Sequence, residues 1–348
     1  MAAKPRFDGE WVKLNQLCTK GRSALRQKDL TNDGPYAVYG ASGIVGSMPT
    51  FQNDIRYVAV VKDGAGVGRA SLCSANTSVL GTMQALIPVE EVSPEYLLHL
   101  IRAMRLGDGF SGSTIPHIYF KDYGQRLVRR VSMVDQGHIV DTLGSIERQM
   151  DIARGQLTKL DDFVKSRFAE MFENDSLVER AQLKDICSLI TDGTHQSPRF
   201  QGEGIPFLFV SNIADNKISY ETTKFISKED YEALIARTPI EVGDVLMSAV
   251  GSFGHPAIVK DERPFCFQRH IAYLKPIRER VNSSFLHAAL LSEESQQYMD
   301  KAAKGAAQRT VTLRSFKDLA VPLPPLALQQ EFADFAAEVD KSRFVVRN

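Results

Sequence analysis

Apolar residues recur along residues 136–172 at alternating steps of four and three positions. The stripe consists of Ile139, Leu143, Ile146, Met150, Ala153, Leu157, Leu160, Val164, Phe168 and Met171. This is the a/d spacing of a coiled-coil helix, with one slip at Phe168 because Arg167 occupies the expected a position. A helix of this length rises roughly 50 Å. The pattern therefore predicts a long helix that needs a partner along its seam.

Shorter apolar runs on both sides of this stripe predict mixed helix and sheet. The first side has strand-like runs at residues 36–39, 57–61 and 83–87, a helix at 94–104, a polar loop at 109–117 and a last strand. The second side has strand-like runs at residues 207–210, 245–247 and 271–274, and a helix at 284–299. A further helix is predicted at residues 328–339.

The two sides read as copies of one plan. Cys18 and Cys187 fall at the same place in two short amphipathic openings, and the loop after Gly112 parallels the loop after Gly305. The triplet Phe-Lys-Asp follows in both, at Phe120 and Phe316. A two-fold repeat of this kind is more informative than any single motif.

The repeat predicts an α+β chain with two mixed α/β domains in tandem. The expected boundaries are residues 1–134 for the first domain, 135–175 for a spacer helix, 176–325 for the second domain and 326–348 for a second, shortened helix. The shortening indicates a naturally truncated gene or a shortened chain, so that the second helix covers only part of the seam. The seam between the two helices is predicted to contain Ile139, Leu143, Ile146, Met150, Leu157, Leu160, Val164, Phe332 and Val339.

Composition is that of a globular protein outside the membrane, with 43% hydrophobic and 24% charged residues. No apolar run approaches the ~20 residues of a membrane span, and the first residues lack the apolar core of a signal peptide. The four cysteines form no CxxC pair, which favours a reducing, cytoplasmic setting. Residues 1–134 contain 16 lysines and arginines against 11 acidic residues, whereas residues 135–180 contain 6 against 10. This distribution permits DNA contact at the domains without requiring it.

Catalytic motifs are missing from the sequence. It contains no Asn/Asp-Pro-Pro-aromatic tetrapeptide of an amino-methyltransferase and no GxxxxGK[ST] phosphate loop. Residues 64–68 read GxGxG, which predicts a turn between strands rather than a phosphate cradle. Residues 191–195 could hold a metal through Asp192 and His195, but a third ligand is lacking. A structural turn in which Asp192 bonds its own backbone and a recognition loop that touches DNA both remain open.

Polar loops at equivalent places supply candidate DNA-binding residues. Lys62 and Arg69 flank the glycine turn and could reach phosphates, while Arg309 and Gln308 suit guanine and adenine edges. A solvated loop or buried polar packing is the alternative at each place. The candidates are Lys62, Arg69, Ser113, Thr114, His117, Thr194, His195, Ser252, His255, Arg269, Lys304, Gln308, Arg309 and Thr310.

The order of these motifs resembles the specificity subunit of type I restriction-modification systems. The likeness rests on residues 190–195 with Pro198, and on residues 163–168, 242–247, 322–326 and 329–332. It covers nearly the whole chain. The first copy departs from the pattern, because residues 131–134 replace the proline-rich start of the helix.

The resemblance implies two target recognition domains that read the halves of a split double-stranded DNA site. It also implies that the two long helices pair as an antiparallel coiled coil and hold these domains apart. It implies no catalytic group, metal or cofactor in this chain. Two methyltransferase subunits would modify adenine with S-adenosylmethionine, and endonuclease/translocase subunits would use ATP and magnesium. The acidic face that contains Glu147, Asp151, Asp161 and Asp162 is either solvated or a docking surface for a methyltransferase subunit.

Three other functions stay open at this point. The same repeat could form a stand-alone DNA-binding regulator, or a coiled-coil adaptor that joins two protein-binding modules. An enzyme with scattered catalytic residues is the third, although no clustered acid/base or metal set supports it.

Overall fold

The computed structural model describes residues 7–112, 115–173, 177–306 and 308–347. The chain divides into two compact units, residues 1–151 and 152–348. The division falls inside the long helix α3 (Met133–Phe168), whereas the sequence placed domain boundaries at both ends of that helix. Its first turns pack on the first unit through Ile139 and Val140, and its end packs in the core of the second through Phe168.

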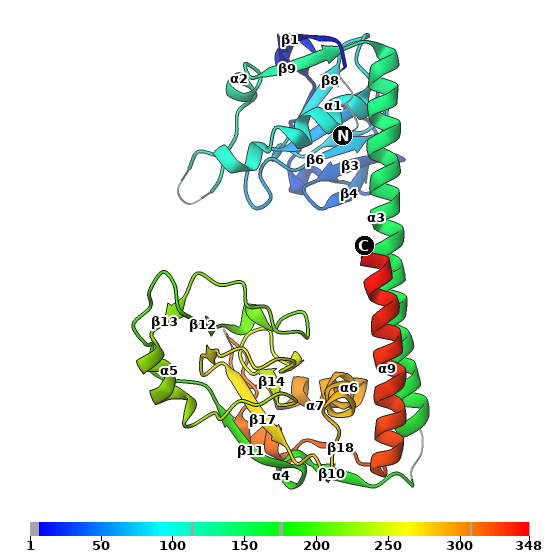
Figure 1. Ribbon diagram of the computed structural model, residues 1–348. Helices are drawn as coiled ribbons and strands as arrows, with labels where there is room; N and C mark the ends of the chain where they lie inside the picture. Colours follow the sequence, from blue (N-terminus) through cyan, green and yellow to red (C-terminus); the bar gives the residue numbers. More distant parts are fainter. Residues whose placement is uncertain (1–6, 113–114, 174–176, 307, 348) are drawn as a thin grey trace. The chain divides into compact units, whose positions relative to one another are not determined.

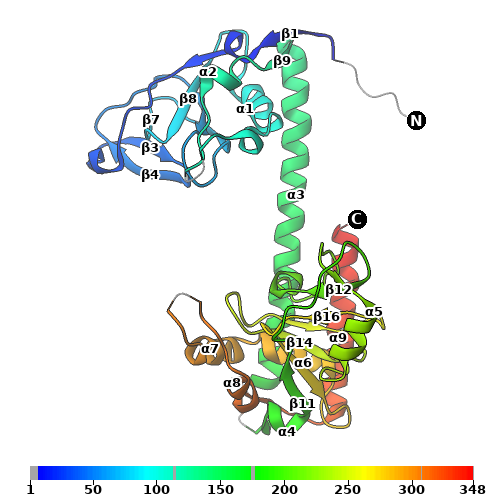
Figure 2. The same cartoon turned by 90° about the vertical axis from the view of Figure 1, so that its left-hand side faces the viewer.

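The first unit is built on a four-stranded antiparallel sheet, with strand order β2-β8-β5-β6, beside a three-stranded sheet β4-β3-β7 and a two-stranded ribbon β1-β9. Helix α1 lies between the four-stranded sheet and α3, as Figures 1 and 2 both show. The elements are β1 (Gly9–Lys13), β2 (Cys18–Lys20), β3 (Tyr36–Gly40), β4 (Gly43–Met48), β5 (Tyr57–Val61), β6 (Ala70–Cys73), β7 (Ser78–Val79), β8 (Met83–Pro88), α1 (Pro94–Ala103), α2 (Phe120–Tyr123) and β9 (Leu127–Val131).

The second unit has the same strand order, with a sheet β11-β17-β14-β15, a sheet β13-β12-β16 and a ribbon β10-β18. Helix α6 takes the place of α1 and contacts both β15 and α9. The elements are β10 (Arg180–Gln182), α4 (Leu183–Ile186), β11 (Cys187–Asp192), β12 (Ile205–Leu208), β13 (Phe225–Ile226), α5 (Lys228–Ile235), β14 (Val245–Ser248), β15 (Pro256–Ile258), β16 (Cys266–Phe267), β17 (Ile271–Pro276), α6 (Ser283–Leu291), α7 (Glu293–Ala302), α8 (Leu313–Asp318), β18 (Ala320–Pro322) and α9 (Leu326–Arg347).

Strand registers correspond between the units, apart from a bulge between Cys187 and Leu189 that β2 lacks. Cys18 pairs with Pro88 in the first sheet, and Cys187 pairs with Pro276 in the second, so the predicted register of the two cysteines is confirmed. All four cysteines are buried and free. Burial raises the pKa of Cys18 and of Cys187 to about 12, which is typical of an unreactive thiol in a core.

Three predictions about local structure were wrong. The helix predicted at residues 284–299 is two helices, because the Ser292 hydroxyl accepts a hydrogen bond from the Ser295 amide and caps a new helix, α7. The strand predicted at residues 207–210 ends at Leu208, and a short 3₁₀ turn follows it. The Phe-Lys-Asp triplets are not equivalent, because one begins α2 at Phe120 whereas the other ends α8.

Helix α9 runs beside the last part of α3 in the second unit (Figure 1). The ring of Phe335 packs 5.2 Å from that of Phe163, and Phe332 packs 5.3 Å from Phe168. Farther along α9, Arg343 Nη2 lies 2.7 Å from Asp161 Oδ1. Because contacts advance along α9 while they recede along α3, the two helices run antiparallel.

An aromatic cluster joins these helices to the second core. Phe168, Phe172, Phe285 and Phe332 are each at most 2% exposed, and the ring centroids of neighbouring members lie between 5.1 and 6.3 Å apart. Burial of each such side chain contributes about 1.5–3 kcal/mol. The slip in the heptad pattern at Phe168 coincides with this cluster. A π-helical turn, Ala169–Glu173, continues α3 and brings Phe172 into it.

The predicted seam is covered only in part. Leu157, Leu160 and Val164 are half-buried, and Phe332 and Val339 are buried. In contrast, Leu143, Ile146 and Met150 are 38%, 48% and 49% exposed, so the helix packing predicted for them does not occur within the described chain. The α9 contacts described above fall on the part of α3 that follows residue 160, which leaves these three side chains in solvent.

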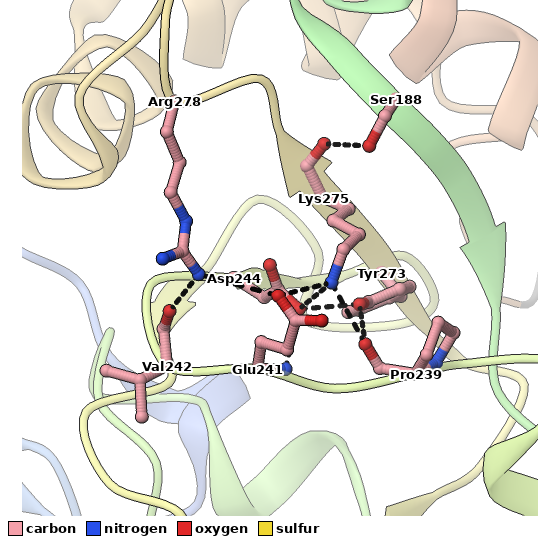
Figure 3. A network of polar contacts seen from close by, with 8 residues as sticks. All are labelled: Ser188, Pro239, Glu241, Val242, Asp244, Tyr273, Lys275 and Arg278. Atoms are coloured by element: carbon pink, nitrogen blue, oxygen red, sulfur yellow. Dashed lines mark hydrogen bonds and ion pairs between the residues drawn. The ribbon is translucent and has the colours of Figure 1, made fainter.

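A buried polar network fixes the start of β14 (Figure 3). The Asp244 carboxylate is 1% exposed and accepts hydrogen bonds from the Glu241 amide at 2.8 Å and the Tyr273 hydroxyl at 2.5 Å, while Lys275 Nζ lies 3.4 Å away. Burial and this carboxylate raise the pKa of Tyr273. In the first sheet the position of Asp244 is occupied by Tyr57, whose hydroxyl lies 3.0 Å from Thr77 Oγ1. The network therefore stabilises the sheet of the second unit and is not part of the repeat.

Trp11 is the single tryptophan of the chain and lies on the β1-β9 ribbon. It pairs across the ribbon with Arg129, whose guanidinium carbon lies 5.5 Å from the centroid of the indole ring. The residue is 61% exposed. Its outward position follows from strand alternation, because the neighbouring Val12 points into the core.

Candidate nucleic-acid interface

Polar loops gather at one edge of the four-stranded sheet in the second unit. Strand β14 ends at Ser248, which pairs with Ile271 at the start of β17, and β11 ends at Asp192, which pairs with Ala272. The chain segments that leave this edge contain most of the candidates predicted for this half of the sequence. These segments are residues 193–195, 249–255, 268–270 and 304–310.

Backbone hydrogen bonds hold the loop of residues 304–310 against this edge. Lys304 and Thr310 exchange two bonds of 3.0 and 2.8 Å, and the Gly251 amide donates to Arg309 O at 2.9 Å. Gly305 has a φ of +115°, and a Cβ atom there would lie 2.4 Å from Gln308 O. Only glycine closes this turn without strain.

The first unit has the same loop on the same edge. Ser111 and His117 exchange bonds of 2.9 and 2.7 Å, and the Gly64 amide donates to Pro116 O at 3.0 Å. Gly112 has a φ of +96°. The predicted correspondence of the two loops is thus confirmed at the level of individual backbone bonds. Ser113 and Thr114, which were predicted to touch DNA, lie outside the described residues.

Arg309 is held in place by two neighbouring segments. Its Nη1 donates to Asp300 Oδ1 at 2.7 Å, and its Nη2 donates to Asp300 O. The guanidinium carbon lies 5.2 Å from the centroid of the Phe253 ring. The side chain is still 44% exposed. Such an ordered and accessible guanidinium can contact a phosphate or a guanine edge with little further loss of side-chain freedom.

The other candidates of this loop are accessible or partly accessible. Lys304 and Gln308 are exposed, and Thr310 is half-buried. Arg269 is exposed on the turn before β17, and its amide donates to Thr194 O at 3.0 Å. This bond brings the segment of Thr194 beside the turn of Arg269, so the structure places both on one surface.

The histidine candidates sit in polar pairs. His117 Nδ1 lies 2.7 Å from Asp63 Oδ1, and His195 Nε2 lies 2.8 Å from Asp192 Oδ2. His255 contacts Ser252 Oγ at 3.0 Å and Asn216 Oδ1 at 3.1 Å. Each of these imidazoles therefore has a partner within the protein and is still at least partly accessible to DNA.

The carboxylate of Asp192 has two side-chain partners. It contacts His195 and lies 3.7 Å from Arg237 Nη2. Thr194 Oγ1 instead bonds the backbone, at Gln196 O. Among the described residues, no group of three or more His, Cys, Asp or Glu could hold a metal ion.

The glycine-rich segment after β5 is a turn between strands, as predicted. Gly64, Gly66 and Gly68 all have positive φ, and the Gly68 amide donates to Val61 O at 2.8 Å. A Cβ atom on Gly68 would lie 2.3 Å from the Gly107 amide nitrogen, so this glycine packs against the chain. Arg69 folds over the turn and donates to Gly66 O at 3.4 Å, and Lys62 is half-buried beside it.

Sequence reasoning missed Arg22. It lies two residues after the end of β2, where the chain leaves the first sheet, and it is exposed. The basic spacing of Lys20, Arg22 and Arg26 was the available signal. It was overlooked because the segment lies in the opening of the domain, far in sequence from the other candidates.

Comparison with known proteins places this fold. The family described as the type I restriction modification DNA specificity domain matches residues 176–344. The EcoBI type I restriction enzyme specificity subunit of Escherichia coli is 23% identical over 252 residues, which cover 64% of this chain and 53% of that protein. The MjaVIII specificity subunit of Methanocaldococcus jannaschii is 22% identical over 272 residues, which cover 70% of this chain and 63% of that protein. The chain thus spans between about half and two thirds of the length of these relatives.

Solved structures agree on the fold across the chain. The S subunit of a type I restriction-modification system from M. genitalium superposes with a TM-score of 0.58 at 15% identity, covering 100% of this chain and 93% of that one. A chain from a study of complex assembly and conformational transition in the type I system gives a TM-score of 0.50 at 18% identity, covering 99% of this chain and 93% of that one. The model of the type I restriction modification DNA specificity domain thus matches most of the second unit, and the chain as a whole is similar in sequence and in fold to type I restriction specificity subunits.

Proposed function

We propose that this chain is the non-catalytic DNA-specificity subunit of a type I restriction-modification complex. The main support for this proposal is the loop that recurs at the same sheet edge of both units with the same backbone hydrogen bonds. In each unit this loop lies beside basic or hydrogen-bonding side chains, which suit phosphates and base edges. Each unit then reads one block of a bipartite double-stranded DNA target.

The long helices are the proposed spacer between the two readers. The antiparallel contacts of α3 with α9 support this role, because packed helices keep a fixed length. Two readers on a rigid spacer recognise blocks at a fixed separation, as dimeric DNA-binding proteins do. The spacing between the blocks is therefore a property of the protein.

Catalysis is assigned to partner subunits. Two methyltransferase subunits would bind S-adenosylmethionine and modify adenine, and endonuclease/translocase subunits would use ATP and magnesium. The complex would act in the cytoplasm. Among the described helices, none is long and apolar enough to cross a membrane.

The test is methylation mapping of the assembled complex. The chain is co-expressed with a type I methyltransferase subunit in a host that lacks other adenine methylation, and methylated adenines are mapped across the genome. We expect two short sequence blocks around an unspecified gap of constant length. Methylation without a bipartite motif would contradict the proposal, and the absence of any methylation that depends on this chain would favour a stand-alone regulator or an adaptor.

A further inference from the structure

Gln136, in the first turn of α3, is a polar side chain with 1% exposure. Its Oε1 accepts a hydrogen bond of 2.9 Å from the amide of Ser93, the residue that caps α1. Its Nε2 donates to Glu91 O at 2.9 Å and to Val131 O at 3.1 Å. One amide thereby joins the start of the long helix to the start of α1 and the end of β9.

Gln329, in the first turn of α9, makes the same three bonds in the second unit. Its Oε1 accepts from the amide of Asn282, which caps α6, at 2.9 Å. Its Nε2 donates to Arg280 O at 3.1 Å and to Pro324 O at 2.8 Å. It is 0% exposed. In both units the two acceptors lie at the same places, one two residues before the cap and the other five residues before the glutamine.

A buried side-chain amide that makes three hydrogen bonds fixes the direction of its contacts, whereas an apolar side chain does not. An apolar side chain could fill the same space while the helices rotate or tilt against each other. Three bonds to three backbone groups allow one arrangement, and loss of any of them leaves a buried polar group unpaired. The repetition of this arrangement argues that the angle itself is what matters.

We propose that Gln136 and Gln329 are positioning residues that set the angle between each DNA-reading domain and its spacer helix, and so set the gap length that the complex accepts. The proposal rests on the proposed function. The geometry makes the angle consequential, because α3 has 36 residues and is about 54 Å long. A tilt of about 4° at its base moves the far end by about 4 Å, which exceeds the 3.4 Å rise between neighbouring nucleotides.

The test compares gap discrimination in the assembled complex with its methyltransferase partner. DNA substrates contain the mapped blocks with the natural gap or with one base pair more or fewer, and the methylation rates on these substrates are compared. For Gln136→Met, which keeps the volume of the side chain and removes its hydrogen bonds, we expect the preference for the natural gap to fall about tenfold. Both blocks should remain unchanged, because the reading loops are untouched.

Three variants separate positioning from general destabilisation. Leu97→Val makes a small cavity beside α1 and leaves the hydrogen bonds intact, and Gln149→Met changes an exposed glutamine of α3. Both should keep the natural preference for gap length. Gln329→Met repeats the test in the second unit, should Gln136→Met fail to fold. Thermal unfolding of every variant accompanies the rates.

The outcomes distinguish this proposal from the proposed function. If the wild-type complex shows no bipartite motif, the proposed function fails. If it does show one, and Gln136→Met and Gln329→Met each retain the wild-type gap preference within twofold, the positioning role is overturned alone. An equal loss of discrimination in Leu97→Val would also overturn it, since stability rather than angle would then explain the effect.

Discussion

Substitution of Arg309 tests most directly whether the loop of residues 304–310 contacts DNA. Its guanidinium is ordered by Asp300 and Phe253 and remains accessible. We expect Arg309→Ala to weaken binding to the cognate site by about 1–3 kcal/mol, because a charged contact to DNA is lost. Binding titrations at several salt concentrations measure this. Loss of preference at one base of the second block would identify a base contact, whereas a uniform loss with a smaller salt slope would identify a phosphate contact.

Arg263→Ala is the matched control for this prediction. Arg263 also covers an aromatic ring, 4.4 Å from the centroid of Tyr220, but it follows β15 at the opposite edge of the sheet. It should bind DNA like the wild type. Asp300→Asn should preserve the hydrogen-bond acceptor for Arg309 while removing a negative charge from the surface, so its affinity should not fall. Wild-type affinity in Arg309→Ala would remove this residue from the interface.

His287, in α6, predicts a dependence of stability on pH. Its Nε2–H donates to Asn216 O and Pro256 O, at 3.2 and 3.1 Å. Burial lowers its pKa by more than these two hydrogen bonds raise it, and Lys260 lowers it further while Asp340 raises it. The unfolded chain therefore binds a proton at a higher pH than the folded chain does. Stability should fall as the pH drops below the ordinary histidine value of about 6.5, by at most about 1.4 kcal/mol per pH unit.

Thermal unfolding at a series of pH values between neutral and mildly acidic measures this effect. His287→Gln keeps a donor for the two carbonyls and cannot titrate, so its unfolding temperature should fall less on acidification than that of the wild type. His138→Gln, on an exposed position of α3, should behave like the wild type. Equal acid sensitivity of all three proteins would assign the effect to other groups.

At the level of residues, the sequence identified the loops better than the roles of their side chains. The match of residues 111–117 with 304–310 followed from small residues around a glycine, and the backbone bears it out. The partners of Arg309 and Asp192 could not be inferred, because Asp300 and Arg237 are joined to them by folding rather than by spacing. The burial of Gln136 and Gln329 could not be predicted, since nothing in a single sequence marks a glutamine as buried.

Among the elements, α3 gives a prediction about length. The apolar side chains of Leu143, Ile146 and Met150 are exposed, and Glu147 between them pairs with Arg102 of α1 at 2.9 Å, so an insertion after Met150 leaves this pair and the buried residues of α3 in place. Seven added residues lengthen a helix by about 10.5 Å and turn its far end by only about 20°. Methylation mapping should therefore show a gap about three base pairs longer, with both blocks unchanged.

An insertion of five residues at the same place provides the control for length. It adds about 7.5 Å but turns the far end by about 140°. One reading edge would then face away from the DNA, so methylation at any bipartite site should be lost. Blocks that change their sequence after the seven-residue insertion would contradict the ruler role of the helix.

Periodicity predicted the long helix and its seam because a repeat of three and four is a strong and extended signal. Periodicity wrongly predicted helix packing at Leu143, Ile146 and Met150. A pattern of apolar positions shows which side chains could pack, but it does not show whether a partner helix reaches them. The break at Ser292 was missed for a different reason. Apolar spacing continued through it, while the signal was a capping serine followed by Glu293 and Glu294.

For the whole molecule, the proposed function predicts that two modest binding events combine. Each unit alone contacts only one block, and the spacer raises the effective concentration of the second contact. Scrambling either block should reduce affinity by about 10²- to 10⁴-fold. Scrambling both should leave only salt-dependent, non-specific binding. Competition titrations with the four DNA duplexes measure this. A duplex that binds fully with one block scrambled would show that only one unit reads sequence.

The tandem plan of the chain was accessible from sequence because its order of elements is repeated, and repeats are recognised without knowledge of any contact. The chemistry of the two cores was not accessible. The same strand position is Tyr57 in one sheet and Asp244 in the other, with Thr77 or Tyr273 and Lys275 as partners. Equivalent backbone positions in the two units thus carry unrelated side chains with unrelated partners. The role of a residue in one unit therefore cannot be assigned from its counterpart in the other.

Trp11 gives the chain a built-in optical probe. It is the only tryptophan, it lies on the β1-β9 ribbon of the first unit, and its indole is largely in water beside the guanidinium of Arg129. Selective excitation of tryptophan therefore reports on the first unit alone, whereas tyrosine signals mix both units, because six of the ten tyrosines lie in residues 1–151. A protein that covers the ribbon should shift the emission to shorter wavelength, whereas a ligand confined to the second unit should leave the spectrum unchanged.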